Sequence, residues 1–99
     1  MVQIVRIEQV DDANASMYIS VMPCSSIEKA KETILEIINM DFDGNWGSLT
    51  DAASELNCDL EHCNWDGSTF RWFDNGQGDA YIIGSVNEKE MEFQKFGTI

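Results

Sequence analysis

Hydrophobic and polar residues alternate along the early part of the chain. β-Branched residues are frequent in residues 2–10, and the stretch after them alternates Met17, Ile19 and Val21 with Tyr18, Ser20 and Met22. Period-two alternation is typical of strands, and turn-forming residues 11–15 lie between the two stretches. The pattern predicts a β-hairpin, with Pro23 ending its second strand.

A second hairpin is predicted farther along the chain. Residues 69–73 and 80–86 are rich in aromatic and β-branched side chains. Residues 74–79 between them contain the pair Asn75-Gly76, and Asn-Gly between two such runs is a strong hairpin signal.

The last residues of the chain fit two alternatives. Met91 and Phe93 would share one face of a strand within residues 90–96. Asn87 and Glu90 have the spacing that caps a short helix, so the sequence leaves this segment open.

A helix is predicted over about residues 26–40. Ser25 and Glu28 have the spacing of a capping box. Apolar residues then recur every three or four positions, at Ile27, Ala30, Ile34 and Ile37 or Ile38. Residues 41–47 contain two glycines among turn formers and are expected to form a loop.

A second, shorter helix of about ten residues is predicted after this loop. Ser48 and Asp51 give its capping signal, and its apolar stripe consists of Leu49, Ala52 or Ala53, and Leu56. The sequence therefore predicts an α+β fold with the order ββααββ, in which two helices pack on an antiparallel sheet of about four strands. No linker or repeat divides the chain, so we expect one domain over residues 1–99.

The composition adds a strong imbalance of charge. The 99 residues include 18 Asp and Glu against 6 Lys and Arg, for a net charge of −12, while 43% hydrophobic residues suffice for one core. This excess of acid points to a basic protein partner and disfavours direct binding to nucleic acid or to anionic membranes.

The expected location is cytoplasmic. The N-terminus lacks the basic and then apolar progression of a signal peptide, and no apolar stretch approaches the roughly 20 residues of a membrane-spanning helix. An odd number of cysteines, namely Cys24, Cys58 and Cys63, favours reduced thiols over a disulfide framework.

The acidic residues concentrate in the middle of the chain. No Lys or Arg occurs between residues 32 and 70, where nine carboxylates occur. Asp51 and Glu55 fall on one helix face and repel each other, so a role other than stability is expected for them. An acidic surface that serves only solvation is the competing interpretation. The candidate partner-binding residues are Asp41, Asp43, Asn45, Trp46, Asp51, Glu55, Asp59, Glu61 and Trp65.

No pattern indicates catalysis, a metal site or a cofactor. Cys58, His62 and Cys63 crowd into six residues, whereas a structural zinc site needs two ligand pairs separated by a longer loop. Neither a P-loop nor a dinucleotide-binding glycine motif is present. We therefore expect a binding protein that is not an enzyme.

One segment resembles a known family. Phe42, Gly44, Asn45, Trp46, Leu49 and Asp51, which follow an amphipathic helix, are similar to the loop and helix of barstar-type ribonuclease inhibitors. The resemblance covers about residues 42–56. It implies that this loop and helix enter the active-site cleft of a ribonuclease, with Asp51 meeting the cationic groups that bind phosphate.

These observations favour a small acidic inhibitor. It would be an immunity protein or antitoxin that neutralises a nuclease toxin, or a phage-type anti-defence protein such as an anti-CRISPR or a DNA mimic. The alternative is a structural or adaptor module that binds through its sheet edges or its first helix, with acid present for solubility. Salt sensitivity of binding separates the two, and the sequence leaves open whether the chain forms a homodimer.

Overall fold

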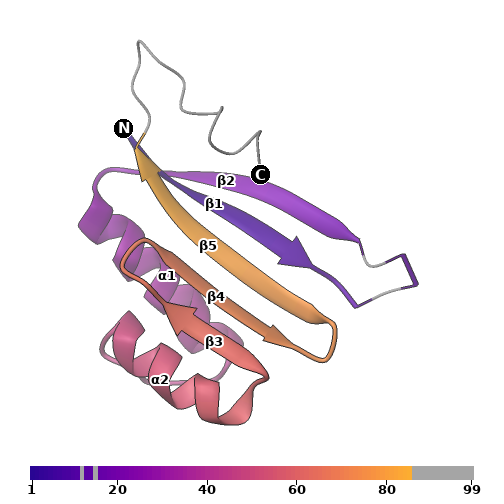
Figure 1. Ribbon diagram of the computed structural model, residues 1–99. Coiled ribbons are helices and arrows are strands. Elements are labelled where there is room, and N and C mark those ends of the chain that lie inside the picture. Colours follow the sequence, from indigo (N-terminus) through magenta and orange to yellow (C-terminus); the bar gives the residue numbers. More distant parts are fainter. Residues whose placement is uncertain (12, 15, 86–99) are drawn as a thin grey trace.

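An antiparallel sheet and two helices make up the computed structural model, which describes residues 1–11, 13–14 and 16–85 (Figure 1). The elements are β1 (Val2–Gln9), β2 (Met17–Cys24), α1 (Ile27–Asp41), α2 (Leu49–Asp59), β3 (His62–Trp65), β4 (Thr69–Asp74) and β5 (Gln77–Ser85). The predicted α+β class and both predicted helices are confirmed. The segment 90–96, for which strand and helix were both open, lies outside the described residues.

The five described strands lie in the order β2-β1-β5-β4-β3. Both predicted hairpins are present, as β1–β2 and β4–β5. The pairing of β1 with β5 joins the hairpins, placing Ile4 opposite Ile83 and Arg6 opposite Tyr81. The β4–β5 turn uses Asn75 and Gly76, which both have positive φ angles, as the Asn-Gly signal predicts for a tight hairpin turn.

The predicted number of about four strands is too low, because β3 was not recognised. This strand has four residues and pairs with β4. Its alternation is nevertheless visible, since Cys63 is buried and Trp65 half-buried while His62 and Asn64 are exposed. A run of four residues is too short to distinguish a strand from a loop by periodicity alone.

Two predicted boundaries are also wrong. Pro23 does not end β2, which continues to Cys24. Among the described strands β2 pairs with β1 alone, and an edge strand tolerates the missing N–H of a proline. The cap of α1 is Ser26 instead of Ser25, because the Ser26 hydroxyl accepts the backbone N–H of Lys29 at 3.1 Å.

The start of α2 agrees with its predicted capping signal. The Ser48 hydroxyl accepts the backbone N–H of Asp51 at 3.1 Å. Neither α1 nor α2, the helices of the described residues, is long and apolar enough to span a membrane.

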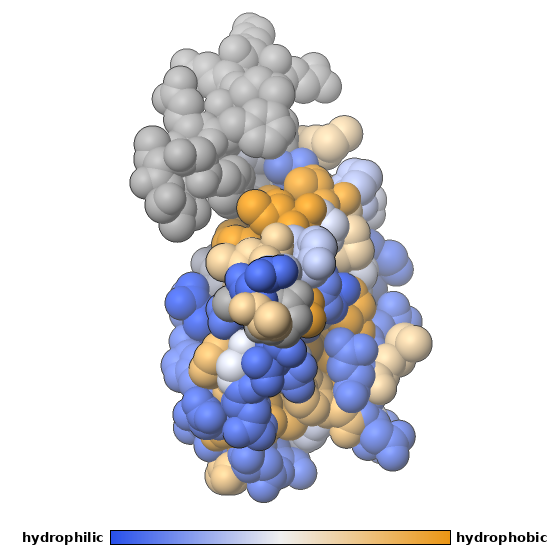
Figure 2. Space-filling model, turned by 90° about the vertical axis from the view of Figure 1, so that its right-hand side faces the viewer, coloured by the Kyte–Doolittle hydropathy of each residue, from blue (hydrophilic) through white to orange (hydrophobic). Residues whose placement is uncertain are grey.

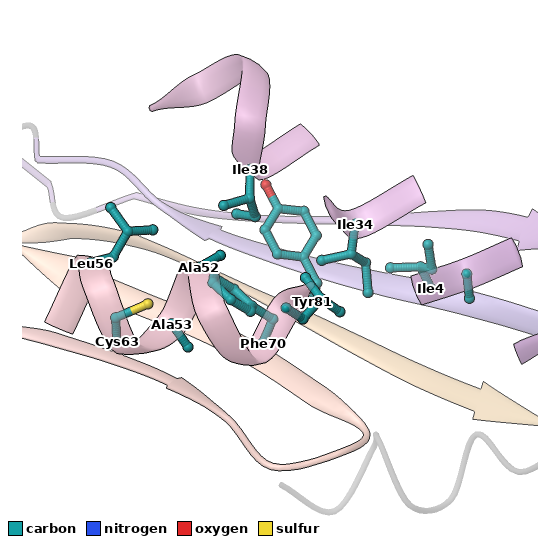
Figure 3. Packing of buried hydrophobic residues seen from close by; sticks show 11 residues of the cluster. Ile4, Ile34, Ile38, Ala52, Ala53, Leu56, Cys63, Phe70 and Tyr81 are labelled. Carbon is teal, nitrogen blue, oxygen red and sulfur yellow. The ribbon is translucent and has the colours of Figure 1, made fainter. Parts of the chain in front are cut away.

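The core lies between the sheet and the two helices. Tyr81 of β5 and Phe70 of β4 are its largest fully buried side chains. The Tyr81 ring stands between Ile34 and Ile38 of α1, whereas Phe70 lies beneath α2 (Figure 3). The other members of this buried cluster are Ile4, Ala30, Leu49, Ala52, Ala53, Leu56 and Cys63.

The edge strand β2 contrasts with this core. Its side chains at Met17, Ile19 and Val21 are 62%, 71% and 48% exposed, and none of its eight residues is charged. Exposed apolar edge strands of this length are uncommon in proteins, because their free backbone groups can pair with another chain.

Substitution of two isoleucines of α1, the buried Ile34 and the exposed Ile27, tests the packing of this helix. Replacement Ile34→Ala removes a fully buried side chain and is expected to lower the free energy of unfolding by about 2–5 kcal/mol. The control Ile27→Ala changes a side chain that is 48% exposed and should cost less than about 1 kcal/mol. Urea unfolding followed by circular dichroism measures both, and equal losses would contradict the packing of α1 described above.

Candidate functional site

The loop between α1 and α2 is tied to both helices through Trp46. The Asn39 side chain of α1 accepts the backbone N–H of Trp46 at 2.9 Å and donates to its carbonyl oxygen at 3.1 Å. The Trp46 indole N–H donates to the Glu55 carboxylate of α2 at 2.8 Å. The loop is thus a defined surface held by three side-chain hydrogen bonds.

The close approach of the Trp46 ring to the backbone explains the glycine at position 44. The ring of Trp46 lies directly against Gly44, and a β-carbon at that position would overlap the ring. Asp43, the preceding residue, adopts a positive φ of 52°, a conformation that Asp tolerates better than most residues. The Asp-Gly pair therefore lets the chain turn beneath the indole.

Two neighbouring cavities lie where the helices end. The inner cavity, of about 540 Å³, is bounded by the end of α1, by β1 and by the β4–β5 hairpin. The outer cavity, of about 530 Å³, lies between the loop and α2. They share Phe42 and Leu60, so we describe them together as the acidic groove.

Carboxylates are the predominant charged groups in the lining of the acidic groove. The inner cavity has Glu8, Asp41, Asp74 and Asp79, with Arg6 as its basic residue, and the outer cavity has Asp43, Glu55 and Asp59. Figure 2 views the molecule from the side of the β4–β5 turn, and hydrophilic residues predominate over the lower part of that side. The groove therefore favours positively charged groups.

Residues that line the inner cavity form a partly buried hydrogen-bond network with Tyr81. One oxygen of Asp79, Oδ2, accepts the Arg6 guanidinium at 3.2 Å and the Tyr81 hydroxyl at 3.3 Å. Arg6 also reaches Glu8 at 3.4 Å. Burial and the adjacent charge of Asp79 raise the pKa of Tyr81 above its ordinary range, so its hydroxyl remains a donor.

Both helices carry an acid at their C-terminal residue, Asp41 in α1 and Asp59 in α2. Neither helix has a basic residue in its last turn. Because unpaired carbonyl groups make a helix C-terminus electronegative, an acid there is destabilising and a cation is favoured. Both acids line the acidic groove.

The groove brings together most of the site residues predicted from the sequence. Those that line it are Asp41, Asp43, Asn45, Trp46, Glu55 and Asp59. Asp51 is exposed at the start of α2, Glu61 accepts the Asn75 backbone N–H at 3.2 Å, and Trp65 packs against the core. These three do not line the groove, and their role in binding stays a prediction.

Sequence reasoning missed the part of the groove that the strands supply. Arg6, Glu8, Trp72, Asp74 and Asp79 line the inner cavity but lie outside the acidic middle of the chain. The positions of Asp74 and Asp79 at the ends of the Asn-Gly turn were the available signal. Their proximity to Glu8 depends on the register between β1 and β5, which pairs Glu8 with Asp79.

The cysteines and the histidine do not converge. Cys58 is exposed on α2, Cys63 is buried in the core, and His62 is exposed on β3. Within the described ranges, no three His, Cys, Asp or Glu side chains are grouped so that they could hold a metal ion. Burial raises the pKa of the Cys63 thiol to about 11.

Thiol labelling tests these environments. At pH 7 we expect iodoacetamide to modify Cys58 readily and Cys63 only after unfolding. Cys63 is buried, and because pH 7 is far below its thiol pKa of about 11, its thiol is protonated and unreactive. Mass spectrometry of peptides from native and urea-treated protein measures the labelling. Equal rates in the native protein would be inconsistent with a buried Cys63.

The acids at the helix ends are expected to lower stability. Replacement Asp41→Asn, or Asp59→Asn, should raise the free energy of unfolding by about 0.3–1 kcal/mol. The control is Asp51→Asn in the first turn of α2, which removes the same charge from the favourable helix end. Each of the three variants removes one negative charge and so reduces the overall repulsion in the protein equally. The difference between them is the helix end from which the charge is removed. Thermal or urea unfolding that gives equal changes would refute it.

Searches of protein families, curated proteins and solved structures find no match to this chain.

Proposed function

We propose that this protein is a small acidic inhibitor that blocks a basic partner through the acidic groove. The observation that carries the proposal is the pair of carboxylates at the two helix C-termini. These acids weaken their own helices, line one groove and have no basic residue in the same helix turn. A cationic surface docked on the groove would complement both the carboxylates and the negative ends of the two helix dipoles.

The mechanism is occupation of a site that normally holds phosphate. The groove presents seven carboxylates against one arginine, which opposes binding to phosphate groups and attracts the lysines and arginines that bind them. The net charge of −12 would accelerate encounter with a basic protein. A nuclease toxin or a nucleic-acid-binding defence complex is a partner with the required chemistry.

Affinity also needs residues that exclude water. Trp46 and Phe42 are half-buried walls of the groove, and Asn39 and Glu55 already fix the orientation of Trp46. An aromatic side chain that is oriented before binding loses little conformational entropy on association. We therefore assign the anchoring contact to Trp46 and the attraction of the partner to the carboxylates.

Affinity capture followed by a binding assay tests the proposal. The protein is immobilised, partners are bound at low salt, and proteins released by a salt gradient are identified. Dissociation constants are then measured at 50 and 200 mM salt. We expect a basic partner that binds more weakly at the higher salt and that loses nuclease activity or nucleic-acid binding in the complex. A complex indifferent to salt would overturn it.

Charge-neutralising variants locate the interface. The double variant Glu55→Gln with Asp59→Asn should weaken binding at least about tenfold, equivalent to about 1.4 kcal/mol. The matched control, Glu32→Gln with Glu36→Gln, removes two charges from exposed positions on α1 that do not line the groove. Equal effects of the two pairs would show that net charge alone matters. Asp51→Asn tests whether the interface extends to the start of α2, as the barstar resemblance implies.

A second candidate function is an adaptor that binds through β2. The observation in its favour is the uncharged, exposed edge of this strand, at which a peptide from a partner could add as another strand. Binding that survives high salt and is lost in Ile19→Lys would favour this function over the acidic inhibitor.

A further inference from the structure

The floor of the inner cavity contains a carboxylate whose hydrogen bonding is incomplete. The side chain of Asp79 is 5% exposed. Its Oδ2 atom accepts from both Arg6 and Tyr81, whereas Oδ1 is buried and has no hydrogen-bond partner among the described residues. Buried polar atoms in folded proteins are nearly always paired with protein groups or ordered water, so this oxygen needs a donor that the described residues do not supply.

Two unpaired donors lie in the wall of the same cavity. The Trp72 indole N–H and the Nε–H of Arg6 are buried and have no acceptor in the described part of the chain. Trp72 is the cross-strand neighbour of Asp79, so the two residues lie side by side in the sheet. A ligand that takes the place of water at these atoms would therefore both donate and accept hydrogen bonds.

The remaining walls define the charge and shape of the ligand. Glu8, Asp41 and Asp74 add three carboxylates around the cavity. Phe42 and Trp72 form an apolar wall, with ring centroids 5.1 Å apart and planes at 84°. A flat cation with several N–H groups satisfies carboxylates in different directions and stacks on an aromatic ring, which describes a guanidinium better than an ammonium.

We propose that the inner cavity binds one arginine side chain of a basic protein, which deepens the proposed inhibitor function and rests on it. The guanidinium donates to Asp41 and, once the Asp79 side chain turns its buried Oδ1 toward the cavity, to Asp79, while its plane lies against the Trp72 and Phe42 wall. A backbone carbonyl of the same peptide accepts the Trp72 indole N–H. An anionic ligand is disfavoured, because four carboxylates face one arginine in this cavity.

Titration with a blocked amino acid tests this site without the partner. The full chain, labelled with ¹⁵N, is titrated at low salt with N-acetyl-arginine amide, and the indole N–H signals are followed by NMR. Trp72→Phe assigns the Trp72 signal. We expect this signal to shift saturably, while the signal of Trp65, which does not line the groove, stays unchanged.

Matched ligands and variants make the result decisive. N-acetyl-citrulline amide has nearly the same shape without the charge and should bind at least fivefold more weakly, and the lysine analogue should also bind more weakly. Asp41→Asn should weaken arginine binding at least threefold although it is expected to stabilise the fold. The control Glu36→Gln, a charge change on α1 outside the groove, should leave binding unchanged.

Absence of a saturable shift of the Trp72 signal overturns the proposal, and so do three other outcomes. These are equal binding of arginine and citrulline, equal binding of arginine and lysine, and insensitivity of arginine binding to Asp41→Asn. Failure here is distinguishable from failure of the inhibitor function. If a salt-sensitive partner is found but N-acetyl-arginine amide does not shift the Trp72 signal, the groove binds its partner without this pocket. If no basic partner is found, the inhibitor function is refuted whatever the arginine titration gives.

Discussion

One carboxylate, that of Asp79, connects the core to the acidic groove. It receives the hydroxyl of Tyr81, whose ring lies in the core, and the guanidinium of Arg6, which borders the inner cavity. A charge buried to this extent must be paired, because loss of its partners leaves an uncompensated charge in a poorly solvated site. The arrangement requires the observed β1–β5 register, since a shift of one residue would turn Arg6 to the other face of the sheet. Core packing and groove geometry are therefore specified together.

In the acidic groove, hydrogen bonds fix the loop in place while the neighbouring carboxylates repel one another. Hydrogen bonds from Asn39 and to Glu55 hold the loop at Trp46, so the groove has its shape before any partner arrives. Its carboxylates repel one another, and two of them stand at the unfavourable ends of helices. Proteins commonly give up stability at sites of function in this way. If the groove is the binding site that we propose, the same trade-off accounts for the carboxylates gathered there.

Local patterns in the sequence predicted the elements well and their assembly less well. The Ser48 cap, the periodicity of α1 and the Asn75-Gly76 turn are decided by neighbouring residues, and they agree with the structure. The strand β3 was too short for its alternation to be distinctive, and Pro23 was tolerated because β2 is at an edge, a property that only the topology reveals. For the groove, the acidic middle of the chain indicated the loop and α2. Arg6 and Asp79 are 73 residues apart, and long-range strand register brings them together.

Among the residues that the structure describes, the outer edge of β2 has no partner strand, which has a consequence for how this protein behaves in solution. Edge strands are usually guarded by a lysine, a bulge or an inward-pointing charge, and β2 has only Pro23, one residue before its end. Mutual repulsion between molecules of charge −12 keeps such edges apart at a distance. That protection weakens in concentrated salt and near the pI of about 4.1. Under those conditions the β2 edges of two molecules can pair strand to strand, so ionic strength and pH, acting through the net charge, govern whether the molecules remain separate.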